Sequence, residues 1–167
     1  MLFNSISEEI LIQFRGIAGS ENVLVDHELL EKYAHDETED LHFYPEVVVK
    51  PQNAGQISEL LKICNERVIP VTPRGGGTGL SGAALPLYGG LLISMEKFNR
   101  IIEIDERNLQ ATVEPGVITE VFMNAVADKN LFYPVDPSSK GTCFIGGNVA
   151  HGSGGPRVIK YGTIREY

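Results

Sequence analysis

Fourteen of the 18 glycines in this 167-residue chain fall in two clusters, and this clustering constrains the fold more than any other feature. Seven lie between Gly75 and Gly90, and seven more lie between Gly141 and Gly162. Glycine tolerates positive φ and lets a ligand approach the main chain without meeting a Cβ. Successive exposed N–H groups in such a stretch form a concave site for an anion. We therefore expect two loops that bind a ligand through their main chain. Each loop directly follows a strand or an irregular segment that contains proline.

Around the clusters, short apolar runs predict strands and amphipathic stretches predict helices. Asn53 is a typical helix N-cap and is followed by Gln56, as in a capping box. A β-branched run over 47–49, a helix over 54–66 and a strand over 68–72 form a strand–helix–strand unit, most simply a right-handed parallel crossover. The other predicted elements are a helix over 7–18 capped by Ser7, a helix over 27–33, strands over 91–93, 101–104 and 110–113, and a helix capped by Thr119. This mixture predicts an α+β fold and not a regular doubly wound sheet.

The balance of charges argues against a nucleic-acid partner. Lysine and arginine total 14 and aspartate and glutamate total 22, a formal net charge of −8, whereas phosphate neutralisation needs a basic face. No apolar run reaches the roughly 18 residues of a membrane helix, and the N-terminus lacks the pattern of a signal peptide. With only Cys64 and Cys143, no disulfide framework is expected, so we predict a reducing, cytoplasmic location and no transmembrane segment.

The first cluster, residues 73–82, follows a predicted strand and contains Arg74, Thr78 and Ser81. Its glycines match the spacing G-x-G-x-x-G, but that dinucleotide fingerprint requires a helix at its third glycine. Pro86 and the two glycines after it leave no room for such a helix. A P-loop needs a Gly-Lys pair, which the chain lacks. The cluster therefore predicts a diphosphate-binding loop of another type, with a flexible surface turn as the alternative.

Two stretches resemble a known family. The pyrophosphate-binding loop of the FAD-linked oxidases grouped with vanillyl-alcohol oxidase and p-cresol methylhydroxylase resembles VTPRGGGTGLSGAALP. The second flavin-contacting region of that family is similar to YPVDPSSKGTCFIGGNVAHGSGGPRVIKYG. Together the two stretches point to the branch that holds D-lactate dehydrogenase, D-2-hydroxyglutarate dehydrogenase and a glycolate oxidase subunit. The resemblance covers residues 46–167.

The resemblance also implies which residues contact FAD. In the first stretch these residues wrap the pyrophosphate: Pro73, Arg74, Gly75, Gly76, Gly77, Thr78, Gly79 and Ser81. In the second stretch they line the flavin side and run along the dinucleotide: Asp136, Pro137, Ser138, Gly141, Cys143, Gly146, Gly147, Asn148, Gly152, Ser153, Gly154, Gly155, Tyr161 and Gly162. The pair Gly152-Ser153 departs from the family pattern, because many members have Asn-Ala there.

By resemblance, the complete protein is a flavin-dependent 2-hydroxy-acid dehydrogenase or oxidase that passes a hydride from substrate C2 to flavin N5. Some relatives attach FAD covalently through a His in the first loop, where this chain carries Thr78, so non-covalent FAD is expected. The implied partners are a small 2-hydroxy acid and partner subunits of an oxidase complex. Catalytic residues and metal-binding histidines belong to parts of the family that this chain lacks. We therefore predict no catalytic residue and no metal site in it, and no activity for it alone.

The expected organisation is an FAD-binding domain of two subdomains. A helical extension over residues 1–45 precedes a first subdomain over 46–88, which holds the parallel unit and the pyrophosphate loop. A second subdomain over 89–167 has a mixed or antiparallel sheet with helices and is incomplete at its C-terminus, and the cap domain is absent. Two alternatives stay open. One is another oxidase of the family, of the aldonolactone oxidase or alkyldihydroxyacetone phosphate synthase type, and the other is a non-catalytic remnant that binds nucleotide or protein.

Three further features invite weaker interpretations. The acidic stretch 35–42 contains two histidines and four carboxylates, but without a convincing ligand arrangement, so we interpret it as solvated surface. Cys64 lies on the apolar face of the helix over 54–66 and is predicted to be core. For Cys143 we favour a loop contact over a thioether link to the flavin, whereas His151 faces either flavin or solvent.

Overall fold

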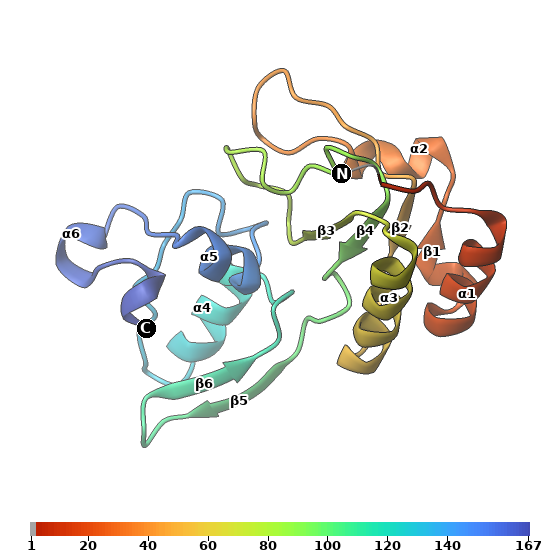
Figure 1. Ribbon diagram of the computed structural model, residues 1–167. Coiled ribbons are helices and arrows are strands. Elements are labelled where there is room, and N and C mark those ends of the chain that lie inside the picture. The colour runs from red at the N-terminus through yellow and green to blue at the C-terminus, as the bar shows by residue number, and fades with distance from the viewer. Residues whose placement is uncertain (1–2) are drawn as a thin grey trace. The chain divides into compact units, whose positions relative to one another are not determined.

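The structure, a computed structural model, describes residues 3–167. Contacts divide the chain after Lys97 into two compact units (Figure 1). Each unit has a buried core of its own. Within the described residues, no helix is long and apolar enough to cross a bilayer.

A four-stranded sheet organises the first unit (Figure 1). Its strands are β1 (Val23–Leu24), β2 (Val47–Val49), β3 (Val71–Arg74) and β4 (Leu91–Ser94), in the order β1-β2-β4-β3. Both β2 and β3 run parallel to β4, and β1 is antiparallel to β2. The two strands of the predicted strand–helix–strand unit thus lie on either side of β4. Because β4 forms hydrogen bonds with both of them, it belongs to the first unit, although the sequence-based division placed it after residue 88.

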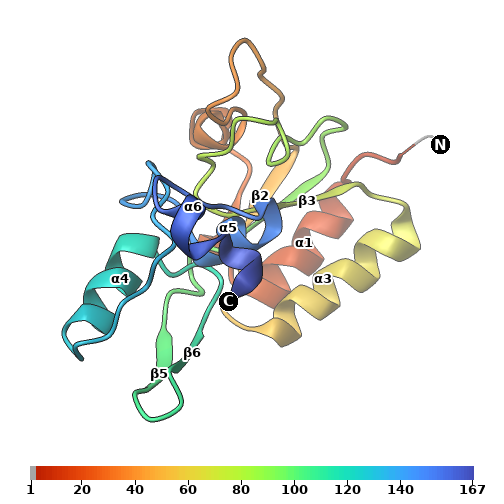
Figure 2. The same ribbon diagram turned by 90° about the vertical axis from the view of Figure 1, so that its left-hand side faces the viewer.

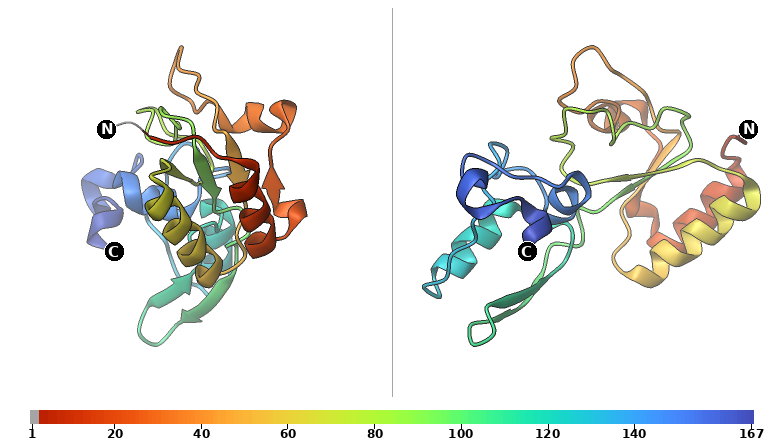
Figure 3. Two further views of the ribbon diagram at one scale, coloured as in Figure 1. Left: turned by 45° about the vertical axis from the view of Figure 1, so that its right-hand side comes forward. Right: turned by 60° about the vertical axis from the view of Figure 1, so that its left-hand side comes forward.

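One face of this sheet is covered by α1 (Glu8–Ala18) and α3 (Ala54–Arg67), which lie side by side (Figures 2 and 3). Phe14 of α1 and Leu60 of α3 are completely buried in the core between the helices and the sheet. Asn53 caps α3 as predicted, since its side chain accepts a hydrogen bond from the Gln56 amide at 3.0 Å. Ser7 lies at the N-cap of α1, but its side chain forms no capping hydrogen bond.

The opposite face is covered by α2 (His27–Leu30) and the 3₁₀ turn Glu31–Tyr33 that follows it. Here Leu30 and Tyr33 pack against Val48 and Leu92 of the sheet. The strand residues on either side of Val48 and of Leu92 point the other way, into the core with α1 and α3. Alternate strand residues point to opposite faces, and these strands are buried on both. This explains why 47–49 is an unbroken apolar run.

The edge strand β3 begins three residues later than the sequence predicts. Val68 caps the C-terminus of α3 in the left-handed conformation, with φ of 54°. The Ile69 amide then donates to the Cys64 carbonyl at 2.8 Å, so the segment before Val71 still belongs to the end of the helix. Ile69 is buried in the core near the helix end, whereas Val68 is exposed, and neither residue pairs in a strand.

The second unit is built on the antiparallel hairpin of β5 (Ile101–Asp105) and β6 (Gln110–Val113), which the sequence predicts (Figure 2). Three helices and a 3₁₀ turn follow: α4 (Thr119–Ala127), α5 (Ile145–His151), α6 (Val158–Tyr161) and the turn Ile164–Glu166. Val117, Phe122, Val126 and Ile145 form its core, packed against the hairpin.

Two predictions in this unit are wrong. Thr119 does not cap α4, because Ile118 occupies the N-cap and the fully buried Thr119 is the first helical residue. The second glycine cluster is not one continuous loop, because α5 forms within it and contains Gly146 and Gly147. Glycine lowers helix propensity, and tertiary packing overrides that preference here.

Candidate functional site

The first glycine loop, residues 75–82, begins where β3 ends, at the carboxyl edge of the parallel strands. The main-chain amides of residues 75–81 donate to no main-chain carbonyl within residues 3–167. Gly77 and Gly82 have positive φ, at 71° and 68°. A row of unpaired amides in a loop that includes left-handed residues is an arrangement that can bind an anion. The loop therefore fits a diphosphate.

Arg74, which the resemblance counts among the residues that wrap the pyrophosphate, is buried, with 6% of its surface exposed. Its Nη2 donates to the carbonyl oxygens of His35 at 2.8 Å and of Lys32 at 3.0 Å. Burial lowers the pKa of Arg74, and the nearby charge of Asp36 counteracts this effect. This side chain therefore connects the loop to the segment after α2, and its contact with FAD stays a prediction.

That segment, residues 35–38, supports the glycine loop, a role that the sequence did not indicate. The Glu37 amide donates to the Gly79 carbonyl at 3.1 Å, and Thr38 Oγ1 accepts from the Gly82 amide at 2.8 Å. Asp36 is buried, whereas the whole stretch was expected to be solvated surface. No local pattern distinguishes Asp36 from its exposed acidic neighbours, because its burial depends on a loop about 40 residues away in sequence.

A polar network lies next to Arg74. Glu96 accepts hydrogen bonds from the Tyr33 hydroxyl at 2.7 Å and from Lys50 Nζ at 2.9 Å, and Lys32 Nζ lies 3.4 Å from it. Burial by itself would raise the pKa of Glu96, but the hydrogen bonds from Tyr33 and Lys50 and the two lysine charges lower it to about 2. The Arg74 guanidinium lies over the Tyr33 ring. This network fixes Tyr33, whose carbonyl belongs to the stretch that Arg74 contacts.

In the second unit, Gly146 is required by packing. Its amide donates to the Pro115 carbonyl at 2.8 Å, and a Cβ on residue 146 would lie 2.6 Å from Pro115 Cβ. A Cβ on Gly147, by contrast, would meet nothing within 4 Å. Of the two helical glycines, Gly146 therefore joins α5 to the end of the hairpin, whereas Gly147 has open space beside it.

Two predicted contact residues of this unit, Cys143 and Asn148, are buried and bonded to each other through Thr119. Asn148 Nδ2 donates to Thr119 Oγ1 at 2.6 Å, and that oxygen lies 3.2 Å from both the carbonyl oxygen and the Sγ of Cys143. Asn148 is 3% exposed, and Thr119 is fully buried. These side chains therefore hold α4 and α5 together, and the contact of Cys143 and Asn148 with FAD stays a prediction.

Asp136 and Gly155 come together at the turn after α5. A Cβ on Gly155, whose φ is 147°, would overlap the Asp136 carbonyl. The Asp136 carboxylate is paired with Lys140 at 2.9 Å and with Arg157 at 3.4 Å. Neither Gly154 nor Gly155 donates its amide to a main-chain carbonyl within the described residues. This turn offers two free amides beside a carboxylate whose charge is already balanced.

The remaining predicted residues lie at the surface or in supporting positions. Pro73 is exposed on the edge strand, and Ser81, Ser138 and Gly141 are also at least partly exposed. Ser153 is bonded on both sides, since its amide donates to the Asn148 carbonyl and its carbonyl accepts from the Ile164 amide, each at 2.9 Å. The structure groups the first predicted set in one unit and the second set in the other. Convergence of the two sets on one ligand stays a prediction.

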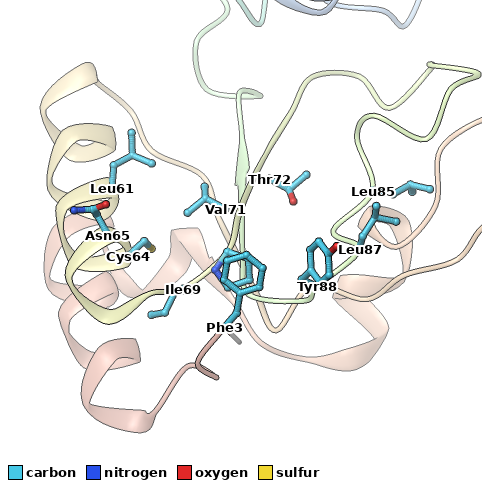
Figure 4. Close-up of a pocket in the computed structure, with 11 residues that line it drawn as sticks. Phe3, Leu61, Cys64, Asn65, Ile69, Val71, Thr72, Leu85, Leu87 and Tyr88 are labelled. Carbon is cyan, nitrogen blue, oxygen red and sulfur yellow. The ribbon is translucent and has the colours of Figure 1, made fainter. Parts of the chain in front are cut away.

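A pocket of about 580 Å³ lies elsewhere in the first unit, between α3, β3 and the segment after the glycine loop (Figure 4). Its lining includes Phe3, Leu61, Leu87 and Tyr88, and no charged side chain contributes to it. None of the predicted FAD-contacting residues lines this pocket. An uncharged pocket does not suit a diphosphate, so the glycine loop is the stronger candidate for the cofactor site. Over residues 3–167, no group of three or more His, Cys, Asp or Glu side chains is arranged to hold a metal ion.

Comparison with known proteins assigns most of the chain to a family. Residues 45–167 match a family described as "FAD binding domain". The chain is 43% identical over 162 residues to the glycolate oxidase subunit GlcD of Bacillus subtilis (strain 168), covering 97% of this chain and 34% of that protein. It is 37% identical over 169 residues to the D-lactate dehydrogenase of Anaerostipes hadrus, covering 99% and 34%. The chain thus spans about a third of the length of these curated relatives.

Two solved structures show the likeness of the fold. An alkyldihydroxyacetonephosphate synthase matches 99% of this chain and 33% of its own, with a TM-score of 0.87 and 18% identity. A p-cresol methylhydroxylase matches 91% of this chain and 31% of its own, with a TM-score of 0.76 and 27% identity. These matches confirm the predicted α+β fold and the resemblance to the oxidases grouped with p-cresol methylhydroxylase.

Proposed function

The chain belongs to the FAD binding domain family, and from this premise we propose that it is the FAD-binding part of a 2-hydroxy-acid dehydrogenase or oxidase of the glycolate or D-lactate type. FAD is the cofactor that the family match supports. The names of the relatives, a glycolate oxidase subunit and a D-lactate dehydrogenase, support an oxidoreductase as the complete protein. A 2-hydroxy acid is the substrate class that both names share.

The observation that carries this proposal is the row of unpaired amides over residues 75–81. The FAD pyrophosphate bears two negative charges, and this chain has a net charge of −8, so the overall field does not attract it. Local main-chain donors therefore have to hold it. In this proposal the amides of the loop bind the pyrophosphate, and the hydroxyls of Thr78 and Ser81 add further donors.

The rest of the chain orients the loop and the dinucleotide. Arg74 and residues 35–38 hold the first loop in place, while Gly154 and Gly155 offer free amides in the second unit. When bound, FAD supplies the acceptor for a hydride from C2 of the 2-hydroxy acid. The protein contributes binding, orientation and local electrostatics to that chemistry.

Binding is proposed to be non-covalent. Thr78, in the first loop, offers no nucleophile suited to a flavin link. Cys143 is 4% exposed, and its Sγ lies 3.2 Å from Thr119 Oγ1 in the core of the second unit. A thiol placed there is not available to a flavin ring, which supports the preference for a loop contact over a thioether.

The alternatives have weaker support. The likeness to the alkyldihydroxyacetonephosphate synthase is at 18% identity, which shows the fold alone, whereas the relatives named for 2-hydroxy acids are 43% and 37% identical. Since the Bacillus subtilis protein is named as a subunit, we extend the proposal to partner subunits of an oxidase complex. A cytoplasmic location stays a prediction. If the chain binds no FAD, that result favours the other alternative, a non-catalytic remnant.

A fluorescence titration with FAD tests the loop assignment. Gly76 is exposed and has no positive φ, so its backbone conformation does not itself require glycine. We expect Gly76→Val to abolish FAD binding, because a branched side chain then occupies the position of the phosphate oxygens, with little change in melting temperature. Gly16→Ala is the control, since a Cβ on this α1 residue meets nothing within 4 Å. Unchanged affinity in Gly76→Val contradicts the assignment.

A further inference from the structure

One carboxylate oxygen of the first unit is buried without a hydrogen-bond partner. Asp36 is 7% exposed, and its Oδ1 accepts from the Thr38 amide at 2.9 Å, whereas its Oδ2 has no partner among the described residues. The Arg74 guanidinium is near, but its hydrogen bonds go to main-chain carbonyls within residues 32–35. A buried acceptor without a donor destabilises the folded state, so its presence in a native protein calls for an explanation.

This oxygen belongs to the segment that supports the glycine loop. The residues that follow Asp36 are bonded to the loop, through the Glu37 amide to the Gly79 carbonyl and through Thr38 Oγ1 to the Gly82 amide. The amides of residues 75–81 in turn lack main-chain acceptors within residues 3–167. The loop and the segment bonded to it thus contain a row of unpaired donors and one unpaired acceptor.

The chemistry of these groups separates their roles. A carboxylate repels an anion, so Asp36 is unsuited to contacting a pyrophosphate. An anion held by the loop uses some of the amides, and those that point away from it need another acceptor. A buried carboxylate oxygen within the supporting segment suits that purpose, since charge-assisted hydrogen bonds are stronger than neutral ones.

We propose that Asp36 is a positioning residue for FAD binding: as the loop closes on the pyrophosphate, Asp36 Oδ2 accepts a hydrogen bond from a loop amide that the anion does not use. This inference rests on the proposed function of the loop. The unpaired oxygen makes the ligand-free loop less favourable than the loaded one. Binding therefore gains from a contact that the free chain lacks, which is a differential interaction between two states.

The test compares FAD affinity with the stability of the FAD-free chain in Asp36→Asn. The asparagine Oδ1 still accepts from the Thr38 amide, but its NH₂ group then replaces the free acceptor. We expect FAD to bind at least tenfold more weakly, measured by fluorescence titration. We expect the melting temperature without FAD to change little, because the loss of the attraction between Asp36 and the Arg74 guanidinium is offset by removing a buried charge whose Oδ2 has no hydrogen-bond donor. A purely structural aspartate would lose affinity and stability together.

Glu39→Gln is the matched control, because it removes the same charge from an exposed residue of the same acidic stretch that lies outside residues 35–38. Its FAD affinity should stay within about twofold of the wild-type value, and its melting temperature within about one degree, because most surface substitutions change stability little. In Asp36→Asn, wild-type affinity overturns the positioning role, and so does a loss of affinity accompanied by a lower melting temperature. If the wild-type chain binds no FAD, or Gly76→Val binds it normally, it is the proposed function that fails.

Discussion

The Arg74 guanidinium packs so closely against Gly77 that a Cβ at position 77 would overlap its Nη2 atom. The same nitrogen donates to the carbonyl oxygens of Lys32 and His35. Gly77 also has φ of 71°, which L-residues rarely adopt. Arg74 therefore joins the glycine loop to the segment after α2, and glycine at position 77 leaves room for that contact.

The first prediction concerns this contact. Gly77→Ala should lower the free energy of unfolding by about 1–3 kcal/mol, because it combines a strained φ with a steric overlap. Gly76→Ala, at a position without positive φ, should change it by less than about 0.5 kcal/mol. Urea unfolding followed by circular dichroism measures both variants. Equal stability of the two would contradict the packing of Arg74 against Gly77.

The two glycines of α5 provide a second, internally controlled prediction. In Gly146→Ala the new Cβ would lie 2.6 Å from Pro115 Cβ and 2.9 Å from the Pro115 carbonyl oxygen, which should destabilise the chain by about 1–3 kcal/mol. In Gly147→Ala the Cβ meets nothing within 4 Å, and the higher helix propensity of alanine should stabilise it by about 0.5–1 kcal/mol. Thermal unfolding should therefore shift in opposite directions, and shifts of the same sign would disprove the assignment.

The third prediction concerns the hydroxyl of Thr119. Thr119→Val keeps the shape of the side chain but leaves the buried Asn148 amide without its acceptor. The expected loss is about 1–3 kcal/mol of unfolding free energy. Thr119→Ser retains the hydroxyl and should be the more stable of the two variants in chemical denaturation. If valine is tolerated better than serine, the hydrogen bonds of Thr119 do not hold α4 to α5.

The fourth prediction is a dependence of stability on pH. The pKa of Glu96 is lowered from 4.5 to about 2 in the folded chain. The stability that its ionised form contributes is therefore present above pH 4.5 and is lost as the pH falls from there towards 2. The melting temperature of the wild type should exceed that of Glu96→Gln at about pH 6, and the difference should shrink over this acid range.

Glu66→Gln is the control for the acid range, because Glu66 is an exposed glutamate of α3. Its melting curve should follow that of the wild type at every pH. A constant difference between wild type and Glu96→Gln from about pH 6 down to about pH 2 would show that the carboxylate of Glu96 does not contribute through its charge.

Much of the fold follows from local sequence signals. The apolar periodicity of α3 and its Asn53 cap predict that helix almost to the residue, since the helix runs from Ala54 to Arg67. The hairpin follows from two short runs and the turn between them, where Asp105 Oδ1 accepts from the amides of Arg107 and Asn108. In each case the stabilising contacts lie within a few residues, so the pattern that predicts the element also contains its cause.

Other features were decided by contacts between distant parts of the chain. The glycine spacing and the resemblance that it carries were sufficient to predict an FAD loop, but not that Arg74 turns towards carbonyls about 40 residues earlier in sequence. The burial of Asp36 under the same loop and the helix around Gly146 have the same origin. Periodicity and capping describe the preferences of a segment alone. Which charge is buried, and which glycine has a neighbour too close for a Cβ, is settled only when the segments pack together.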